Sequence, residues 1–181
     1  MKCCFIGHRK IIELQELKQR LQNTIENLIT EKNVKTFIFG SRSEFDLLCH
    51  KIVSDLQSLY PNIERVIYTC KSEFAVLKQN KIELEQMVFN VLKQNVSLCE
   101  YEKEIEHKTK YKSGKASYIE RNKAMIDDSD YCLFYYDENY KPPKRKRSKN
   151  DVFEYQPSSG TSIAFKYAKQ KNKKSINVFI N

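Results

Sequence analysis

The sequence predicts a single α/β domain whose doubly wound, mostly parallel sheet is flanked by helices. Short apolar runs alternate along the chain with longer segments in which apolar residues recur every three or four positions. This alternation is typical of right-handed strand-helix-strand crossovers. The chain has 181 residues, 40% of them hydrophobic, with only four glycines and four prolines, which is the composition of one globular domain.

Three strands and two helices are predicted in the N-terminal part of the chain. The strand runs are short and apolar, and they span residues 2–6, 36–39 and 64–70. Residues 10–30 show the amphipathic spacing of a helix. A second helix follows Ser43, a favourable N-cap residue, and ends before Pro61.

The rest of the chain continues this alternation, with two polar interruptions. Residues 100–113 are strongly charged and predict a surface connection with some helix. A basic, proline-containing insertion spans about residues 138–157. The other predicted elements are helices at 72–93, 118–128 and 161–171 and strands at 96–99, 131–136 and 176–180.

Cysteine usage and hydropathy predict the cellular compartment. None of the six cysteines forms a C-x-x-C pair, and most lie among apolar residues, so we expect buried thiols in a reducing cytosol. No apolar run is long enough for a signal peptide or a membrane span, which predicts a cytoplasmic protein without a membrane partner. The cysteines are Cys3, Cys4, Cys49, Cys70, Cys99 and Cys132.

The net charge of +9 is concentrated in one segment. The run KPPKRKRSKN at residues 141–150 holds six lysines and arginines and no acid, so the rest of the chain is only mildly basic. Such a run is commonly a solvated loop. The alternative is contact with nucleic-acid phosphates, which would make affinity fall steeply with salt.

The first predicted strand is followed by a turn that contains Gly7, His8 and Arg9. Glycine lets a backbone approach a ligand closely, and an arginine forks against a phosphate or carboxylate. A structural turn glycine followed by exposed polar residues explains the same tripeptide. Both interpretations stay open for this turn.

The second predicted strand ends in a similar turn. Gly40 and Ser41 form a second candidate anion-binding turn, and Arg42 is a candidate to point into the same cleft. Asp46 falls in the first turn of the next helix, where the helix dipole stabilises a carboxylate with or without a ligand.

Charged residues surround the strand predicted at 131–136. Glu120 and Arg121 lie on the preceding helix and are candidate ligand contacts, although a solvated helix surface explains them equally. Asp127, Asp128 and Asp130 are spaced to hold a divalent cation or to cap the helix and enter the strand. We favour the second interpretation and predict no metal site.

Small hydroxyl residues and a glycine precede the helix predicted at 161–171. The turn consists of Ser158, Ser159, Gly160 and Thr161. Unpaired backbone N–H groups and the positive end of the helix dipole bind anions at such a position. A plain N-cap needs the same residues. Other glycine-bearing turns at strand ends favour the phosphate-binding interpretation.

These segments together resemble the SLOG superfamily, and in particular its YpsA-like branch of small stand-alone bacterial proteins. The resemblance rests on CFIGHR, FGSRSEFDLL, YIERNKAMIDDSDYCLFYYD and SGTSIAFKYAKQKNKKSINVFI, in that order. The superfamily includes the Lonely Guy phosphoribohydrolases and DNA-processing protein A, which share a Rossmann-like fold. The resemblance implies a nucleotide or nucleotide-derived ligand, with its phosphate at the turn formed by Gly160 and Thr161. The resemblance is also compatible with a homodimer.

One departure from the family bears on catalysis. Arg121 matches the arginine of Lonely Guy enzymes, but no carboxylate follows Thr161 where those enzymes carry a glutamate. The resemblance therefore implies a nucleotide-binding sensor or regulator, with an ADP-ribose-like or NAD-like ligand. Two alternatives stay open. One is an N-glycosidic hydrolase that uses Glu120 or Asp46, and the other is a nucleic-acid-binding protein that uses the basic run. No further cofactor is predicted.

Overall fold

The computed structural model describes residues 1–40, 43–70, 103–107, 115–142 and 158–180. Their strands form one six-stranded sheet in the order β4-β3-β2-β1-β5-β6. Each neighbouring pair is parallel. The strands are β1 (Lys2–Gly7), β2 (Thr36–Phe39), β3 (Glu64–Cys70), β4 (Lys103–His107), β5 (Tyr131–Tyr135) and β6 (Lys174–Asn177).

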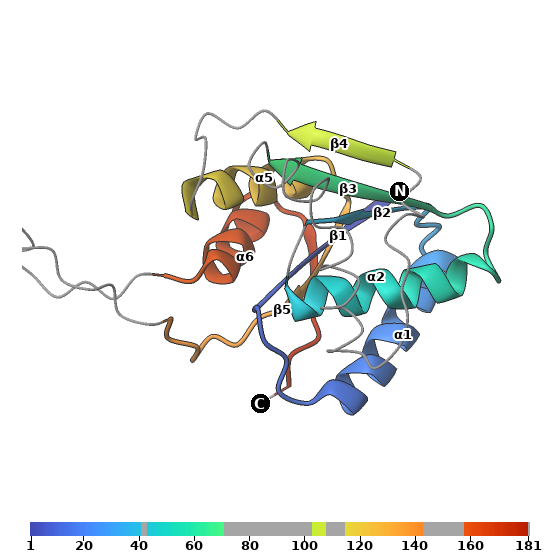
Figure 1. Cartoon of the computed structure of the whole chain (residues 1–181), viewed down its shortest axis with the longest axis horizontal. Coiled ribbons are helices and arrows are strands. Elements are labelled where there is room, and N and C mark those ends of the chain that lie inside the picture. Colours follow the sequence, from blue (N-terminus) through green and yellow to red (C-terminus); the bar gives the residue numbers. More distant parts are fainter. Residues whose placement is uncertain (41–42, 71–102, 108–114, 143–157, 181) are drawn as a thin grey trace, which may run out of the picture.

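Helices cover both faces of this sheet (Figure 1). Side chains alternate along a strand, so β1 directs Cys3 and Phe5 to one face and Cys4 and Ile6 to the other. The first face packs against α1 and α2, and the second packs against α5 and α6. The predicted Rossmann-like, doubly wound α/β fold is confirmed. The described helices are α1 (Leu14–Thr30), α2 (Glu44–Gln57), α5 (Lys115–Asp127) and α6 (Gly160–Gln170).

The N-terminal elements follow the prediction closely. Strands β2 and β3 have the predicted bounds, because their apolar runs are buried on both faces. Ser43 is the N-cap of α2, and its Oγ accepts a hydrogen bond from the backbone N–H of Asp46 at 2.9 Å. That contact satisfies one of the N–H groups that a helix start leaves without an intrahelical partner.

The first helix begins at Leu14, four residues later than predicted. The preceding segment is held in another conformation by its contacts. The backbone N–H of Ile11 donates to Glu44 Oε2 at 3.0 Å, and that of Ile12 donates to the Tyr135 hydroxyl at 3.2 Å. Of the two isoleucines in this segment, Ile11 packs against the core, whereas Ile12 is 71% exposed.

Strand β4 corrects the prediction for residues 100–113. Residues 103–107 pair with β3 in parallel at the edge of the sheet. Edge strands tolerate charged residues, which explains why KEIEH lacks the apolar signature of the inner strands. The helix predicted at 72–93 and the strand predicted at 96–99 lie outside the described residues.

The last strand also differs from the prediction, since β6 spans Lys174–Asn177 instead of residues 176–180. The side chain of Asn177 bonds to both backbone groups of Tyr136, with its Oδ1 accepting at 3.0 Å and its Nδ2 donating at 2.9 Å. The amide side chain of Asn177 therefore takes the place of the next backbone-backbone hydrogen bonds between the two strands. Helix α5 begins three residues earlier than predicted, and α6 and β5 agree with prediction to within one residue.

The structure bears on two further expectations, which concern membrane-spanning helices and the burial of the cysteines. No helix in the described part of the chain has the length and apolar character needed to cross a bilayer. Burial raises the pKa of the Cys3, Cys4 and Cys49 thiols. Cys3, Cys4, Cys49, Cys70 and Cys132 are buried, as predicted, and Cys99 lies outside the described residues.

Candidate functional site

The topological switch point of the sheet lies between β1 and β5. From β1 the chain moves to β2 and β3 on one side, whereas β5 and β6 lie on the other side. Ligands of doubly wound sheets bind at such a switch point, beyond the carboxyl ends of the strands. The two tips are joined by a hydrogen bond from the backbone N–H of His8 to the carbonyl oxygen of Tyr135 at 3.2 Å.

A pocket of about 180 Å³ lies beside the tip of β5 and the N-terminus of α6. Its lining is rich in hydroxyl groups and includes one acid, Glu138, and one base, Lys141. The hydroxyl-bearing residues that line it are Tyr136, Tyr140, Ser158, Ser159 and Ser162.

The N-terminus of α6 supplies one wall of this pocket. Ser159 is the N-cap, and its Oγ accepts a hydrogen bond from the backbone N–H of Ser162 at 3.0 Å. The first turn of α6 contains no acidic residue. A Cβ added to Gly160 would meet no atom within 4 Å, so open space lies in front of the helix start. This wall has the geometry and charge that favour an anion.

His8 directly follows β1, and a contact with the turn after β5 holds its ring. Its Nε2 accepts a hydrogen bond from the backbone N–H of Asp137 at 3.1 Å. Burial lowers the pKa of His8 from its ordinary value, against the opposing effect of Asp137. The neutral ring with an accepting Nε2 carries its proton on Nδ1. The centroid of this ring lies 4.4 Å from that of Tyr140, which lines the pocket.

Gly7 has a packing role in this structure. A Cβ at this position would lie 2.3 Å from Cδ1 of Phe45, the second residue of α2. Only glycine allows α2 to approach the tip of β1 this closely. Arg9 is exposed, and its carbonyl oxygen accepts a hydrogen bond from the backbone N–H of Glu44 at 3.0 Å. The phosphate-binding role of Gly7 and Arg9 stays a prediction.

The structure brings Gly40, Asp46 and Arg121 together at the tip of β2. The backbone N–H of Gly40 donates to Asp46 Oδ1 at 3.0 Å. A Cβ on Gly40 would lie 3.0 Å from Nη2 of Arg121, whose side chain is only 6% exposed. The guanidinium also lies over the ring of Tyr118, 5.3 Å from its centroid. Glycine at this tip leaves room for the arginine. Ser41 and Arg42 lie outside the described residues.

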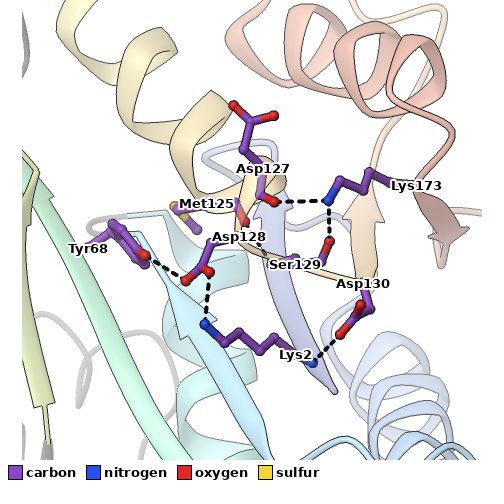
Figure 2. A network of polar contacts seen from close by, with 8 residues as sticks. All are labelled: Lys2, Tyr68, Met125, Asp127, Asp128, Ser129, Asp130 and Lys173. Atoms are coloured by element: carbon purple, nitrogen blue, oxygen red, sulfur yellow. Dashed lines mark hydrogen bonds and ion pairs between the residues drawn. The ribbon is translucent and has the colours of Figure 1, made fainter.

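The aspartates that precede β5 make contacts at the amino ends of the strands, opposite to the ends where the pocket lies (Figure 2). Asp128 accepts hydrogen bonds from Lys2 Nζ and from the Tyr68 hydroxyl, both at 2.8 Å. Asp130 accepts one from the backbone N–H of Lys2 at 2.8 Å. Burial raises the pKa of Asp128, but the bonds from Lys2 and Tyr68 outweigh it and the net shift is downward.

Asp127 completes this region by accepting from the Tyr167 hydroxyl at 2.9 Å. Lys173 Nζ binds the carbonyl oxygens of Asp127 and Ser129, at 2.9 and 2.7 Å. These contacts tie the end of α5 and the entry of β5 to β1 and to the segment after α6, which agrees with a role as cap and strand entry. Among the residues that the structure describes, no group of three or more His, Cys, Asp or Glu side chains is placed to hold a metal ion.

Comparison with known proteins identifies the family. A model of the YpsA family, described as the YspA SLOG family, matches residues 5–171. The chain belongs to this SLOG family. A search of curated proteins gives no match. Membership of the SLOG family suggests that the protein binds or processes a nucleotide-related molecule.

Sequence reasoning missed part of the pocket of this SLOG protein. Tyr136, Glu138 and Tyr140 follow β5 directly, and their position after a strand end was the available signal. Ser162 lies within the predicted apolar helix, so the sequence pattern did not mark it as a pocket residue. Lys141 is the first residue of the basic run and also lines the pocket, and residues 143–157 lie outside the described part of the chain. Glu120 is half-buried on α5 and is not part of the pocket lining.

Proposed function

We propose that this SLOG protein binds a nucleotide or nucleotide derivative, of the ADP-ribose or NAD type, in the pocket at the N-terminus of α6. The protein then acts as a ligand sensor or regulator. The observation that carries the proposal is the position of this hydroxyl-lined pocket beside the switch point between β1 and β5.

The pocket offers the groups that a phosphate needs. The serine hydroxyls donate hydrogen bonds, and the first turn of α6 directs backbone N–H groups and the positive end of its dipole to the same place. Lys141 adds a positive charge at the rim. A phosphate ester is therefore the part of the ligand that belongs at Ser159 and Gly160.

The size of the pocket limits what it encloses. Pockets that enclose a whole drug-sized ligand have volumes of roughly 300 to 1,000 Å³. The pocket here measures about 180 Å³. It suits a phosphate with its attached sugar, and the base of a nucleotide then lies at the rim.

Thermal shift measurements test this proposal with AMP, ADP-ribose and NAD. A ligand present at 100 times its dissociation constant stabilises the folded state by about 2.7 kcal/mol. We expect at least one of the three to raise the Tm of the full chain. No change in Tm with any of them at millimolar concentration would contradict the proposal.

A second candidate function is hydrolysis of an N-glycosidic bond, and Glu138 is the observation that favours it. This carboxylate lines the pocket, whereas Asp46 is already bound to the backbone N–H of Gly40. A carboxylate beside the sugar is suited to assist the departure of the base or to activate water. Release of free base from AMP or NAD, abolished in Glu138→Gln, would support hydrolysis, and binding without product over hours would exclude it.

A further inference from the structure

Tyr140 is an exposed aromatic residue that local contacts hold at the rim of the pocket. Its side chain is 45% exposed, and it lines the pocket together with Tyr136 and the serines of the α6 turn. The turn that carries it is closed by two hydrogen bonds. The backbone N–H of Tyr140 donates to the carbonyl oxygen of Asp137 at 3.3 Å, and that of Asn139 donates to Asp137 Oδ1 at 2.8 Å.

His8, in the turn after β1, supports the ring of Tyr140. The two ring centroids lie 4.4 Å apart with an interplanar angle of 42°. His8 is only 7% exposed, and its Nε2 binds the backbone N–H of Asp137, the first residue of the same turn. One imidazole therefore anchors both the start of the turn and the ring that the turn presents. The orientation of Tyr140 is set before any ligand arrives.

Such an arrangement matches the requirements of base stacking. An aromatic ring that is ordered but exposed keeps apolar surface in contact with water, and a planar base that covers this surface removes it from water. Stacking also gains from a ring that is already ordered, because less side-chain entropy is lost on binding.

We propose that Tyr140 is the platform on which the base of the nucleotide stacks, while the phosphate lies at the N-terminus of α6. This inference rests on the proposed nucleotide-binding function. Every base has a π-face, so a stacking platform distinguishes base-bearing ligands from base-free ones more strongly than it distinguishes one base from another. The site should therefore prefer AMP to ribose 5-phosphate and discriminate weakly between AMP and GMP.

Calorimetric titration of three variants tests the platform. Tyr140→Ala should weaken whichever of AMP, ADP-ribose and NAD binds the wild type by roughly 5- to 150-fold, the range found when stacking aromatics are replaced by alanine. Tyr140→Phe keeps the ring and should retain affinity to within about twofold. Tyr60→Ala is the matched control, because Tyr60 precedes the amino end of β3, does not line the pocket, and donates its hydroxyl hydrogen bond to Glu26.

Ribose 5-phosphate, measured by displacement, separates stacking from pocket shape. Its affinity should be equal for the wild type and Tyr140→Ala, and an equal loss for AMP and ribose 5-phosphate would contradict the platform. The Tm without ligand verifies that the variants fold. If the wild type binds none of the three nucleotides, the proposed function itself fails. If it binds one and Tyr140→Ala binds it equally well, only the platform fails.

Discussion

The Nε2 atom of His8 accepts a hydrogen bond from the backbone N–H of Asp137 at 3.1 Å, which joins the turn after β1 to the turn after β5. An imidazolium cannot accept this bond, because both of its ring nitrogens carry protons. The link between these two turns therefore depends on a neutral His8.

Ligand affinity should weaken as the pH falls through the pKa of His8. Burial lowers that pKa below its ordinary value, so the unfolded chain binds more protons at mildly acidic pH and the folded state loses stability as the pH falls. His8→Gln places an amide oxygen where Nε2 accepts, and it should remove the pH dependence while retaining binding. NMR titration of the imidazole and binding of ADP-ribose or NAD at pH 5 and 7.5 test this, because their pyrophosphate diesters keep their charge over this range whereas the phosphate monoester of AMP does not. An imidazole pKa above 6.5 would contradict the prediction.

His50 should make the stability of the fold rise with pH. Burial and the nearby Arg65 lower the pKa of His50 to about 3. Below the unfolded pKa of about 6.5 the unfolded chain therefore binds one more proton, and stability falls by about 1.4 kcal/mol per pH unit, or about 2 kcal/mol from pH 6.5 to 5. Urea unfolding at the two pH values measures this change. His50→Gln should flatten the slope, and an unchanged slope would assign it to other groups.

Gly7→Ala should destabilise the protein through Phe45. The added Cβ would lie 2.3 Å from Phe45 Cδ1, so either α2 or the ring must move. Overpacking of this kind costs about 1–3 kcal/mol. Combining Gly7→Ala with Phe45→Leu should recover part of that loss, and urea unfolding of the single and double variants gives the coupling energy. Additive effects would show that the two positions do not meet.

Asp128→Asn should cost less than about 1 kcal/mol and leave ligand affinity unchanged. The Lys2 and Asp128 side chains are 44% and 40% exposed, so solvent screens their attraction. The asparagine Oδ1 still accepts from Tyr68 or Lys2. The pair lies where β1 begins and α5 ends (Figure 2). The pocket is lined instead by residues that follow the carboxyl end of β5 and by the start of α6. Urea unfolding and AMP titration of the variant measure its stability and its ligand affinity. A large drop in affinity would place the ligand near Asp128 and contradict the proposed site.

Much of the fold was predictable because its signals are local. Buried strands such as β2 and β3 are continuous apolar runs, and Ser43 and Ser159 cap helices by contacts within three residues. β4 was not predictable in this way, since an edge strand needs no apolar pattern.

The candidate site was predictable only in part, because its geometry depends on contacts between distant residues. The turn at Ser159 and Gly160 has a clear sequence signal, and it lines or borders the pocket. The packing of Phe45 on Gly7 joins two elements that are distant in sequence. The support that His8 gives Tyr140 arises only when β5 lies beside β1. Nothing in the pattern of either segment marks that contact.

Gly160 offers the most direct test of phosphate binding at the N-terminus of α6. Space for a side chain exists there, so Gly160→Asp should fold, and a carboxylate at the first helical position should stabilise the helix by about 0.3–1 kcal/mol. The same charge should repel a phosphate, whereas Gly160→Asn is a neutral match of equal size. Calorimetric titration of both variants with the nucleotide that binds the wild type is the decisive measurement. We expect Gly160→Asp to lose at least tenfold more affinity than Gly160→Asn, and equal affinities for the two variants would contradict phosphate binding at the N-terminus of α6.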